Sequence, residues 1–420
     1  MRATERILLT GFQLLGLDLD VPDWSTGRLW LLRVGLFKLQ CPLEQADDWV
    51  WIVDHTNQIG VEKCLVIVGA RISLLPRGPL RHEDVEILAL IPMISSNGEL
   101  VAEQLNTLVA RTGIPRLIIA DHGSDIASGI KMFCNDNDLT SYILDIKHKT
   151  ASELKRILSK LPNWKKFIVQ AALSRQQLQQ TELAALRPPN QRSKARFMNL
   201  GPLLNWANEV LIVLDGRTAV GQVVETELKT SKTRLLEKLG WVREYKTDLI
   251  AWNELLNMAM IVEKKIRNNG YTSYIRFDVQ RELRSAATTK PAKEFRRTML
   301  DFIDEQAAKI RHNECLPGSS EVLESIFGKF KQLEGDQRRS GLSGSLLMIP
   351  TITGVLDEGI IQEALKSVKT TDVRDWIHNN IGMTVQSKRR LLLSNQKQTK
   401  GVLSVKKGTN LETLPSPRSG

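Results

Sequence analysis

Two apolar runs that each end in an aspartate constrain this chain more than any other feature. Residues 49–53 are all apolar and lead into Asp54, and residues 117–120 are all apolar and lead into Asp121. A continuous apolar run of this length is typical of a strand buried on both faces. Most aspartates at a strand end only cap a turn or a helix. Two of them, at the edge where open α/β sheets bind ligands, indicate a metal site.

The segments between and after these runs predict the rest of a sheet. Apolar segments at 61–72 and 86–93 predict two further strands in an antiparallel meander, and 141–146 predicts a fifth strand. Apolar residues at helical spacing predict helices over 97–112 and 124–135. The resulting order, β-β-β-α-β-α-β, is that of the ribonuclease H-like fold. In that fold the first and fourth strands are neighbours, and here these are the strands that carry the aspartates.

The pattern then changes from sheet to helix. From residue 150 to 312 almost every segment shows the 3.6-residue period of an amphipathic helix. We therefore predict a catalytic core whose first part is 46–149, an all-helical insertion over 150–312, and closing helices of the core over 313–383. The basic end of the chain, 384–420, is poor in apolar clusters and is predicted to be a disordered tail.

The first 45 residues, 1–45, have the size and pattern of a helix-turn-helix. Ser25 is a good cap for the second helix and Gly35 a good stop. In this interpretation Arg28 and Arg33 face outward and contact DNA, because the second helix of such a unit enters the major groove. A plain helical hairpin packed on the sheet fits the same pattern, and the two interpretations stay open.

Charge and cysteine usage narrow the class of partner and the compartment. A formal net charge of +11 and a pI near 9.4 favour a polyanionic partner. The four cysteines form no C-x-x-C pair, which favours reduced core residues over a zinc site or a disulfide framework. No apolar run reaches the ~18 residues of a membrane span, and no signal peptide is evident. We expect a cytoplasmic protein that does not enter a membrane.

Two strand-end carboxylates and a third acid are the ligands of a two-metal phosphoryl-transfer site. Two Mg²⁺ ions about 3.5–4 Å apart activate the attacking oxygen and stabilise the leaving oxygen. Mg²⁺ prefers carboxylate ligands and retains water, so Asp and Glu suit it better than His or Cys. The third acid must come from later in the chain and return to the sheet edge.

These features together resemble a DDE transposase, most closely the hAT-type branch and a related bacterial insertion-sequence transposase. Asp54 and Asp121 end the first and fourth strands. Asp145 to His148 stands where hAT proteins carry a C-x-x-H motif, with Asp145 in place of the cysteine. After the helical insertion comes a predicted helix with a Glu-Ser-aliphatic-Phe motif, whose glutamate is Glu324. The resemblance implies that Asp54, Asp121 and Glu324 are the catalytic acids and bind two Mg²⁺ ions, with Mn²⁺ as a substitute.

Two other glutamates are alternatives for the third acid. Glu321 lies one turn before Glu324 on the same predicted helix. Glu254 lies on a helix of the insertion, and many DDE enzymes place this glutamate on an internal helix. We favour Glu324 and keep Glu254 and Glu321 open.

Several further residues are candidate DNA contacts. Lys147, His148 and Lys149 follow the fifth strand and are predicted to bind phosphates, although His148 alone fits a turn cap equally well. Trp252, in the insertion, is a candidate for stacking on a flipped base, as aromatic residues in the insertions of relatives do. A core position is the more common fate of such a tryptophan.

The function expected from this resemblance is DNA transposition, and the resemblance also implies a bacterial, nucleoid-associated protein. The enzyme would cleave transposon ends and join the freed 3′ hydroxyl to target DNA, acting as a homodimer or larger assembly because two ends must meet. The alternatives are a ribonuclease H-like nuclease or resolvase without strand transfer, and a non-catalytic DNA-binding protein derived from a transposase.

Overall fold

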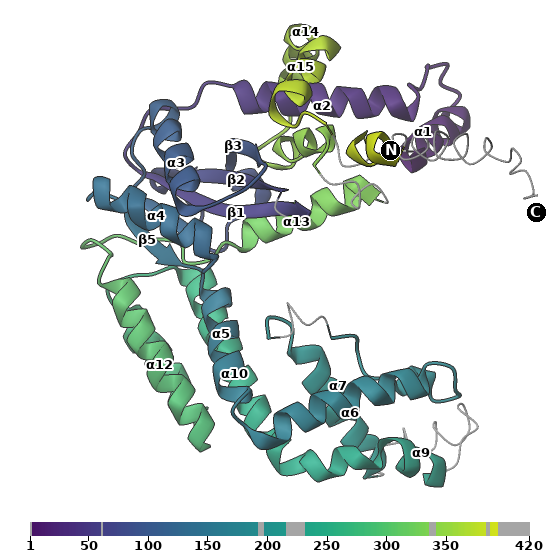
Figure 1. The fold of residues 1–420 in the computed structure, drawn as a ribbon, viewed down its shortest axis with the longest axis vertical. Helices are drawn as coiled ribbons and strands as arrows, with labels where there is room; N and C mark the ends of the chain where they lie inside the picture. Colours follow the sequence, from purple (N-terminus) through teal and green to yellow (C-terminus); the bar gives the residue numbers. More distant parts are fainter. Residues whose placement is uncertain are drawn as a thin grey trace, which may run out of the picture.

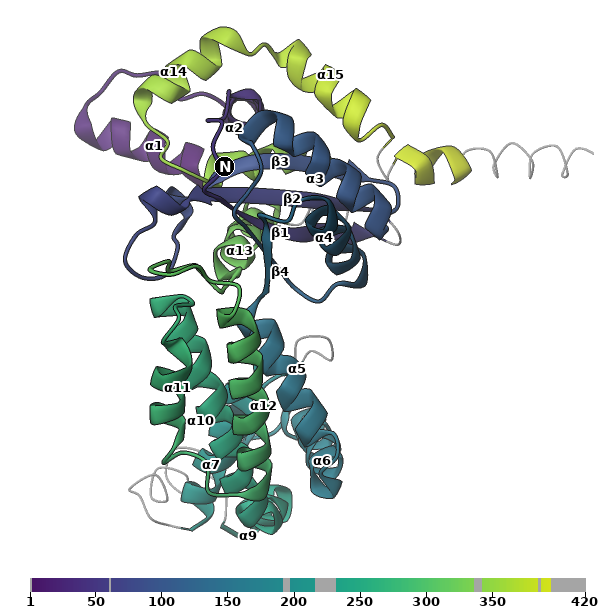
Figure 2. The ribbon, with the colours of Figure 1, turned by 90° about the vertical axis from the view of Figure 1, so that its left-hand side faces the viewer.

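The fold consists of a sheet-containing core and a long helical body that projects from it (Figures 1 and 2). The structure is a computed structural model of the 420-residue chain. It describes residues 2–59, 62–191, 197–215, 232–335, 342–383 and 387–393.

The core is built on one five-stranded mixed sheet. Its strand order is β3-β2-β1-β4-β5, with β2 antiparallel to both β1 and β3, and β4 parallel to both β1 and β5. The strands are β1 (Trp49–Ile59), β2 (Glu62–Arg71), β3 (Glu86–Met93), β4 (Leu117–Ala120) and β5 (Ser141–Leu144). This is the ribonuclease H-like order, so the predicted mixed sheet interrupted by a helical insertion is confirmed.

Helices cover both faces of the sheet because side chains alternate along each strand. Trp51 and Val53 of β1 pack with α3 and α4, whereas Val50 and Ile52 pack on the opposite side with α2 and α13. The covering helices are α3 (Gly98–Thr112) and α4 (Ser124–Asp136) on one face, and α2 (Trp24–Gln40) and α13 (Glu321–Glu334) on the other. Both faces of β1 are therefore buried, as its continuous apolar run predicts.

The N-terminal pair of helices is joined to the core through α2. The first helix, α1 (Arg2–Leu15), has no buried residue, whereas Leu36 and Leu39 of α2 are buried. The prediction that Arg33 faces outward is wrong. Its guanidinium donates hydrogen bonds of 2.5 and 2.6 Å to the carbonyl oxygens of Leu365 and Val368, at the end of α14 (Glu358–Ser367). Arg28 is half-buried. The α2 helix thus packs on the core, as the interpretation of a helical hairpin expects. Entry of α1 and α2 into a DNA groove stays a prediction.

The chain between β5 and α13 forms the projecting helical body. Its helices are α5 (Ile146–Leu158), α6 (Pro162–Leu178), α7 (Gly201–Leu214), α9 (Lys232–Leu239), α10 (Lys246–Asn269), α11 (Ile275–Leu283) and α12 (Lys290–Ala307). In both views α5, α10 and α12 form the stalk, and α6, α7 and α9 lie at the far end (Figures 1 and 2). Figure 2 shows α11 as a further helix of the stalk. Residues 192–196 and 216–231 lie outside the described part of the chain.

An aromatic cluster forms the core at the far end of this body. The Trp252 ring is fully buried, 4.9 Å from the ring of Trp164 and 5.0 Å from that of Phe167. A ring enclosed in this way cannot stack on a DNA base. The predicted DNA contact of Trp252 is therefore wrong, and Trp252 is a core residue, as the other interpretation of the sequence expected.

A buried ion pair fixes the segment that returns from the helical body to the sheet. Arg116, which precedes β4 and is 4% exposed, donates hydrogen bonds of 2.8 and 2.6 Å to the two carboxylate oxygens of Glu314. Arg116 also donates to Ser141 at the start of β5, 2.8 Å away. This two-pronged arrangement is the geometry in which an arginine binds a carboxylate most strongly.

The C-terminal part of the chain packs on the core and then leaves it. After α14 comes α15 (Thr370–Asn380), and residues 387–393 are helical. Within that segment Lys388 forms an ion pair with Glu62 at the start of β2. The predicted disordered tail is therefore wrong for residues 387–393, whereas residues 394–420 lie outside the described part of the chain. None of the described helices is both long and apolar enough to cross a membrane.

Candidate active site

The register of two parallel strands brings Asp54 and Asp121 together. The pairing of β1 with β4 runs from Val50 opposite Leu117 to Val53 opposite Ala120, so the two aspartates are the next residues in register. Neighbouring strands lie about 4.8 Å apart. Because side chains alternate, both aspartates lie on the face of the sheet that α13 covers. The two carboxylates predicted at one sheet edge are thus adjacent.

Backbone N–H groups orient both aspartates. Asp54 Oδ1 accepts a hydrogen bond of 2.6 Å from the N–H of His55, and Asp121 Oδ1 accepts one of 2.8 Å from the N–H of Gly123. The Tyr142 hydroxyl donates to the carbonyl oxygen of Asp121, 2.9 Å away, and so ties β5 to the end of β4. The two side chains are therefore held by the strand ends themselves.

Glu324 joins the aspartates from the first turn of α13. Its Oε2 accepts a hydrogen bond of 2.8 Å from Lys147 Nζ, and its Oε1 lies 3.4 Å from His148 Nε2. The other ring nitrogen of His148, Nδ1, lies 4.0 Å from Asp121 Oδ2. The imidazole therefore stands between the second and third carboxylates.

The buried carboxylate of Asp145 fixes α13 beside the sheet edge. Its Oδ1 accepts from the N–H of His148 and caps α5, at 2.8 Å. Its Oδ2 accepts from the N–H and the hydroxyl of Ser320, at 2.6 and 3.0 Å. Next to this, the N–H of Ile146 donates to the carbonyl oxygen of Gly318, 3.1 Å away. The chain thus leaves the core and returns to it at one point, which sets Lys147, His148 and Glu324 side by side.

The charges of this cluster shift its proton equilibria. Burial, together with the negative charge of Asp121, raises the pKa of Asp54 to about 7. Burial alone would lower the pKa of His148, but its hydrogen bond to Glu324 and the charges of Asp145 and Asp121 raise it to about 8. Burial opposes ionisation of Glu324 as well, yet hydrogen bonds from His148 and Lys147 lower its pKa. The site is therefore a cluster of negative charge that protons and cations partly compensate.

The donor set suits a divalent cation, although the side chains are not arranged around one. Among the described residues, no three His, Cys, Asp or Glu side chains are positioned to hold a metal ion, and the Glu324 carboxylate is bonded to Lys147 and His148. Asp54, Asp121 and Glu324 offer only carboxylate oxygens, the ligands that Mg²⁺ prefers. A cation would also relieve the repulsion that helps raise the pKa of Asp54. The donor types therefore suit a divalent cation, and Glu324 would have to give up its bond to Lys147 to become one of its ligands.

The two alternative glutamates do not join the aspartates. Glu254 accepts hydrogen bonds from the backbone N–H groups of Thr288 and Thr289 and so holds the start of α12. It lies fifteen residues before the end of α10 at Asn269, or about 22 Å along the helix axis. Glu321 pairs with Arg267, 3.3 Å away. Of the three glutamates, only Glu324 contacts a residue that also reaches Asp121.

The candidate phosphate-binding residues have different surroundings. Lys147 and His148 are partly exposed beside Glu324, with 26% and 29% of their side chains accessible. Lys149 turns away, because its ammonium group bonds Glu153, 2.9 Å distant, and lies over the ring of Phe302. DNA contacts by Lys147, His148 and Lys149 stay predictions.

A second polar cluster behind Asp54 was missed from the sequence. Asp125, in the first turn of α4, forms a hydrogen bond with Lys63 of β2 and lies 3.8 Å from Nδ1 of His55. His55 Nε2 lies 3.3 Å from the hydroxyl of Ser96. Asp125 and Ser96 therefore hold the side chain of His55, the residue that directly follows Asp54. The histidine directly after the first aspartate and the aspartate four residues after the second were the available signals.

Comparisons with known proteins add a structural likeness only. No protein-family model matches the chain, and no curated protein sequence matches it. Among solved structures, the chain is similar to the Drosophila P element transposase strand transfer complex, with a TM-score of 0.39 and 11% sequence identity, over 81% of this chain and 87% of that chain. The class, a ribonuclease H-like α/β core with a helical insertion, rests on the strand order and on the chain's own register.

A half-buried glutamate next to the site makes stability depend on pH. Glu263 of α10 accepts a hydrogen bond from the Thr150 hydroxyl of α5, and burial raises its pKa to about 7. The folded state therefore binds a proton that the unfolded state releases above pH 4.5, and stability falls as the pH rises from 4.5 to 7. We expect Glu263→Gln, which keeps an oxygen for Thr150, to be about 1–3 kcal/mol more stable than the wild type at pH 8.

Urea unfolding at pH 5 and at pH 8 measures this effect. The gain of Glu263→Gln should be clearly smaller at pH 5 than at pH 8. The matched control is Glu282→Gln, which removes the charge of a 42% exposed carboxylate paired with Lys265; its stability should change by less than ~1 kcal/mol at both pH values. An equal gain for Glu263→Gln at both pH values would show that Glu263 is ionised throughout.

Proposed function

We propose that this protein is a DNA transposase that cleaves transposon ends and transfers the freed strand into target DNA. The observation that carries the proposal is the meeting of Asp54, Asp121 and Glu324. These three carboxylates come from β1, β4 and α13, which are far apart in the sequence, and converge at one edge of a ribonuclease H-like sheet. A cluster of like charges this close disfavours its own ionisation, and a site for divalent cations is the function that it serves best.

The proposed roles follow from the contacts of each residue. Asp54, Asp121 and Glu324 hold two Mg²⁺ ions, for which Mn²⁺ substitutes. When bound, the metals supply activation of the attacking oxygen and compensation of charge at the scissile phosphate. His148, whose pKa is about 8, carries a positive charge at neutral pH beside two of the acids. We assign to it and to Lys147 the binding of a nonbridging phosphate oxygen.

The partner is DNA, both the transposon end and the target. A net charge of +11 favours a polyanion, and the negative acid cluster by itself would repel one. Cations bound at the acids and basic side chains around them are therefore both needed for the substrate to approach. Because two ends must be cut and joined together, the active form is a homodimer or a larger assembly.

Cleavage and joining of DNA that carries the element's own ends test this proposal. We expect the wild type to nick such DNA with Mg²⁺ or Mn²⁺ and to join the new 3′ end to a target plasmid. Asp121→Asn should lower the nicking rate by about 10³-fold or more, because it removes a charged group that stabilises the transition state. It should still bind the DNA. Asp136→Asn, an exposed aspartate at the far end of α4, is the control and should nick at the wild-type rate.

Other outcomes would favour the two alternatives. Nicking without any joining, under conditions where a 3′ end is available, would identify a nuclease or resolvase. Tight DNA binding without nicking by the wild type, in either metal, would identify a non-catalytic DNA-binding protein. Equal nicking by the wild type and Asp121→Asn would separate the activity from the acid cluster.

A further inference from the structure

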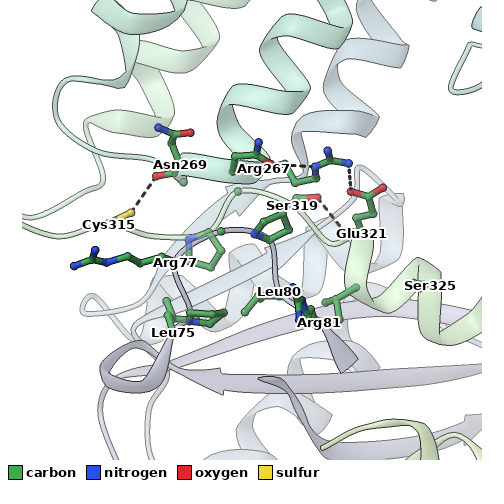
Figure 3. A pocket seen from close by; sticks show the side chains of 18 of the residues that line it. Leu75, Arg77, Leu80, Arg81, Arg267, Asn269, Cys315, Ser319, Glu321 and Ser325 are labelled. Atoms are coloured by element: carbon green, nitrogen blue, oxygen red, sulfur yellow. Dashed lines mark hydrogen bonds and ion pairs between the residues drawn. The ribbon is translucent and has the colours of Figure 1, made fainter. Parts of the chain in front are cut away.

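A hollow that the acid cluster does not use lies against the other side of α13. Its volume is about 1030 Å³. Figure 3 shows Arg77 and Arg81 on the loop between β2 and β3, Arg267 and Asn269 at the end of α10, and Glu321 and Ser325 on α13. The core and the stalk of the helical body thus form opposite walls of the hollow.

A second, smaller hollow shares lining residues with this one and includes Lys147 of the candidate active site. Its volume is about 410 Å³, and it shares Arg267, Ser319 and Glu321 with the first hollow. At its other end it is lined by Lys147, whose ammonium group bonds Glu324. The two hollows adjoin at the start of α13 and are together named the α13 groove here; Lys147 in its lining joins the groove to the third carboxylate.

Cationic side chains line the first hollow, and two of them are available to a ligand. Arg77 is exposed and has no hydrogen-bond or ion-pair partner within the described residues. Arg81 is 77% exposed and lies 3.7 Å from Glu83, a distance typical of a weak surface pair. Arg267 is committed to Glu321, 3.3 Å away. The unneutralised charge of the first hollow is therefore positive and is concentrated on the loop between β2 and β3.

Hydrogen bonds hold this loop in place without a ligand. His82 Nε2 lies 3.0 Å from the Ser325 hydroxyl, and its Nδ1 lies 2.6 Å from Lys329 Nζ. The carbonyl oxygen of His82 accepts from the N–H of Gly354, 2.7 Å away. The wall that carries Arg77 and Arg81 is thus fixed to α13, and binding there does not have to order a free loop.

The lining of the first hollow also offers apolar surface next to the cations. Leu75, Leu80 and Val322 contribute side chains to it, together with three prolines of the surrounding segments. Guanidinium groups beside apolar walls match a chain of phosphates that carries sugars and bases. We propose that the α13 groove binds the DNA that flanks the scissile phosphate, with Arg77 and Arg81 on its backbone. This inference rests on the proposed function and assigns to it a path for the substrate.

Salt-dependent binding measurements on the full chain test the assignment. The probe is a fluorescently labelled short duplex of mixed sequence, titrated by anisotropy in EDTA so that no cleavage intervenes. The logarithm of the binding constant falls as the logarithm of the salt concentration rises, and each lost phosphate contact makes this slope less steep by about 0.9. The slope of the double variant Arg77→Ala/Arg81→Ala should therefore be less steep by about 2, and its affinity for DNA at low salt should be about tenfold lower than that of the wild type. Glu83→Gln, which removes a competing charge, should bind more tightly than the wild type.

Arg281→Ala is the matched control. Arg281 lies on α11, away from the groove, and is 76% exposed, which matches the 77% of Arg81; it pairs with Asp278, 2.9 Å away. Its loss should leave the slope unchanged, and all variants should melt at the wild-type temperature. A wild-type slope for the double variant would overturn the assignment, as would an equal loss for Arg281→Ala. Because EDTA excludes cleavage, a failure of the proposed transposition would appear only in the nicking assay, independently of this result.

Discussion

Replacement of Glu324 by glutamine is expected to lower the rate of DNA nicking by about 10³-fold or more while DNA affinity is retained. Glutamine has nearly the shape of glutamate and leaves one oxygen for Lys147. It removes the negative charge that, in our proposal, completes the set of three carboxylates. Since the Glu324 side chain is only 29% exposed and its partner Lys147 26%, loss of their ion pair should cost about 1–3 kcal/mol of stability, so the melting temperature of the variant is measured beside its nicking rate. Loss of nicking could then not be explained by unfolding.

Two other glutamates sharpen this experiment. Glu254→Gln should nick at close to the wild-type rate, because Glu254 only holds the start of α12 through Thr288 and Thr289. Normal nicking by Glu324→Gln together with a dead Glu321→Gln would move the third acid by one turn of α13. Rates measured at saturating DNA separate these effects on turnover from effects on affinity.

The sheet and its two aspartates were accessible from the sequence because their signals are local. Apolar runs of five and four residues identify β1 and β4, and the strand that ends in Asp54 is a neighbour of the strand that ends in Asp121 in the predicted fold. The aspartates then meet in register without any side-chain packing being known. Glu324 was a different case. Nothing in its own segment connects α13 to β1, and only the resemblance to a transposase family pointed to it.

The wrong predictions all concern contacts between distant segments. The sequence around Arg33 is that of an exposed helix face, but α14, more than 300 residues later, supplies two carbonyl oxygens for its guanidinium. Trp252 was assigned by residue type, and its burial depends on Trp164 and Phe167 of another helix. Arg77 lies between the second and third predicted strands, and its place beside α13 depends on the bonds of His82 to Ser325 and Lys329.

Removal of the Asp145 carboxylate should have the largest effect on stability. Asp145 is 1% exposed and accepts from the N–H groups of His148 and Ser320 and from the Ser320 hydroxyl. Asp145→Ala leaves these donors without their acceptor, at a cost of about 1–3 kcal/mol for each buried group. We expect a loss of roughly 3–4 kcal/mol in the free energy of unfolding, measured with urea.

Asp357→Ala is the matched control, because Asp357 caps α14 through the N–H of Ile360 but is exposed and forms no hydrogen bond to a second helix in the described part of the chain. It should lose only about 1 kcal/mol. Ser320→Ala combined with Asp145→Ala should show a coupling of about 1 kcal/mol, since both act on one contact. Equal losses for Asp145→Ala and Asp357→Ala would reduce Asp145 to an ordinary helix cap. A larger loss at Asp145 would mean that the return of α13, and with it the position of Glu324 relative to Asp54 and Asp121, depends on one carboxylate at the base of the helical body.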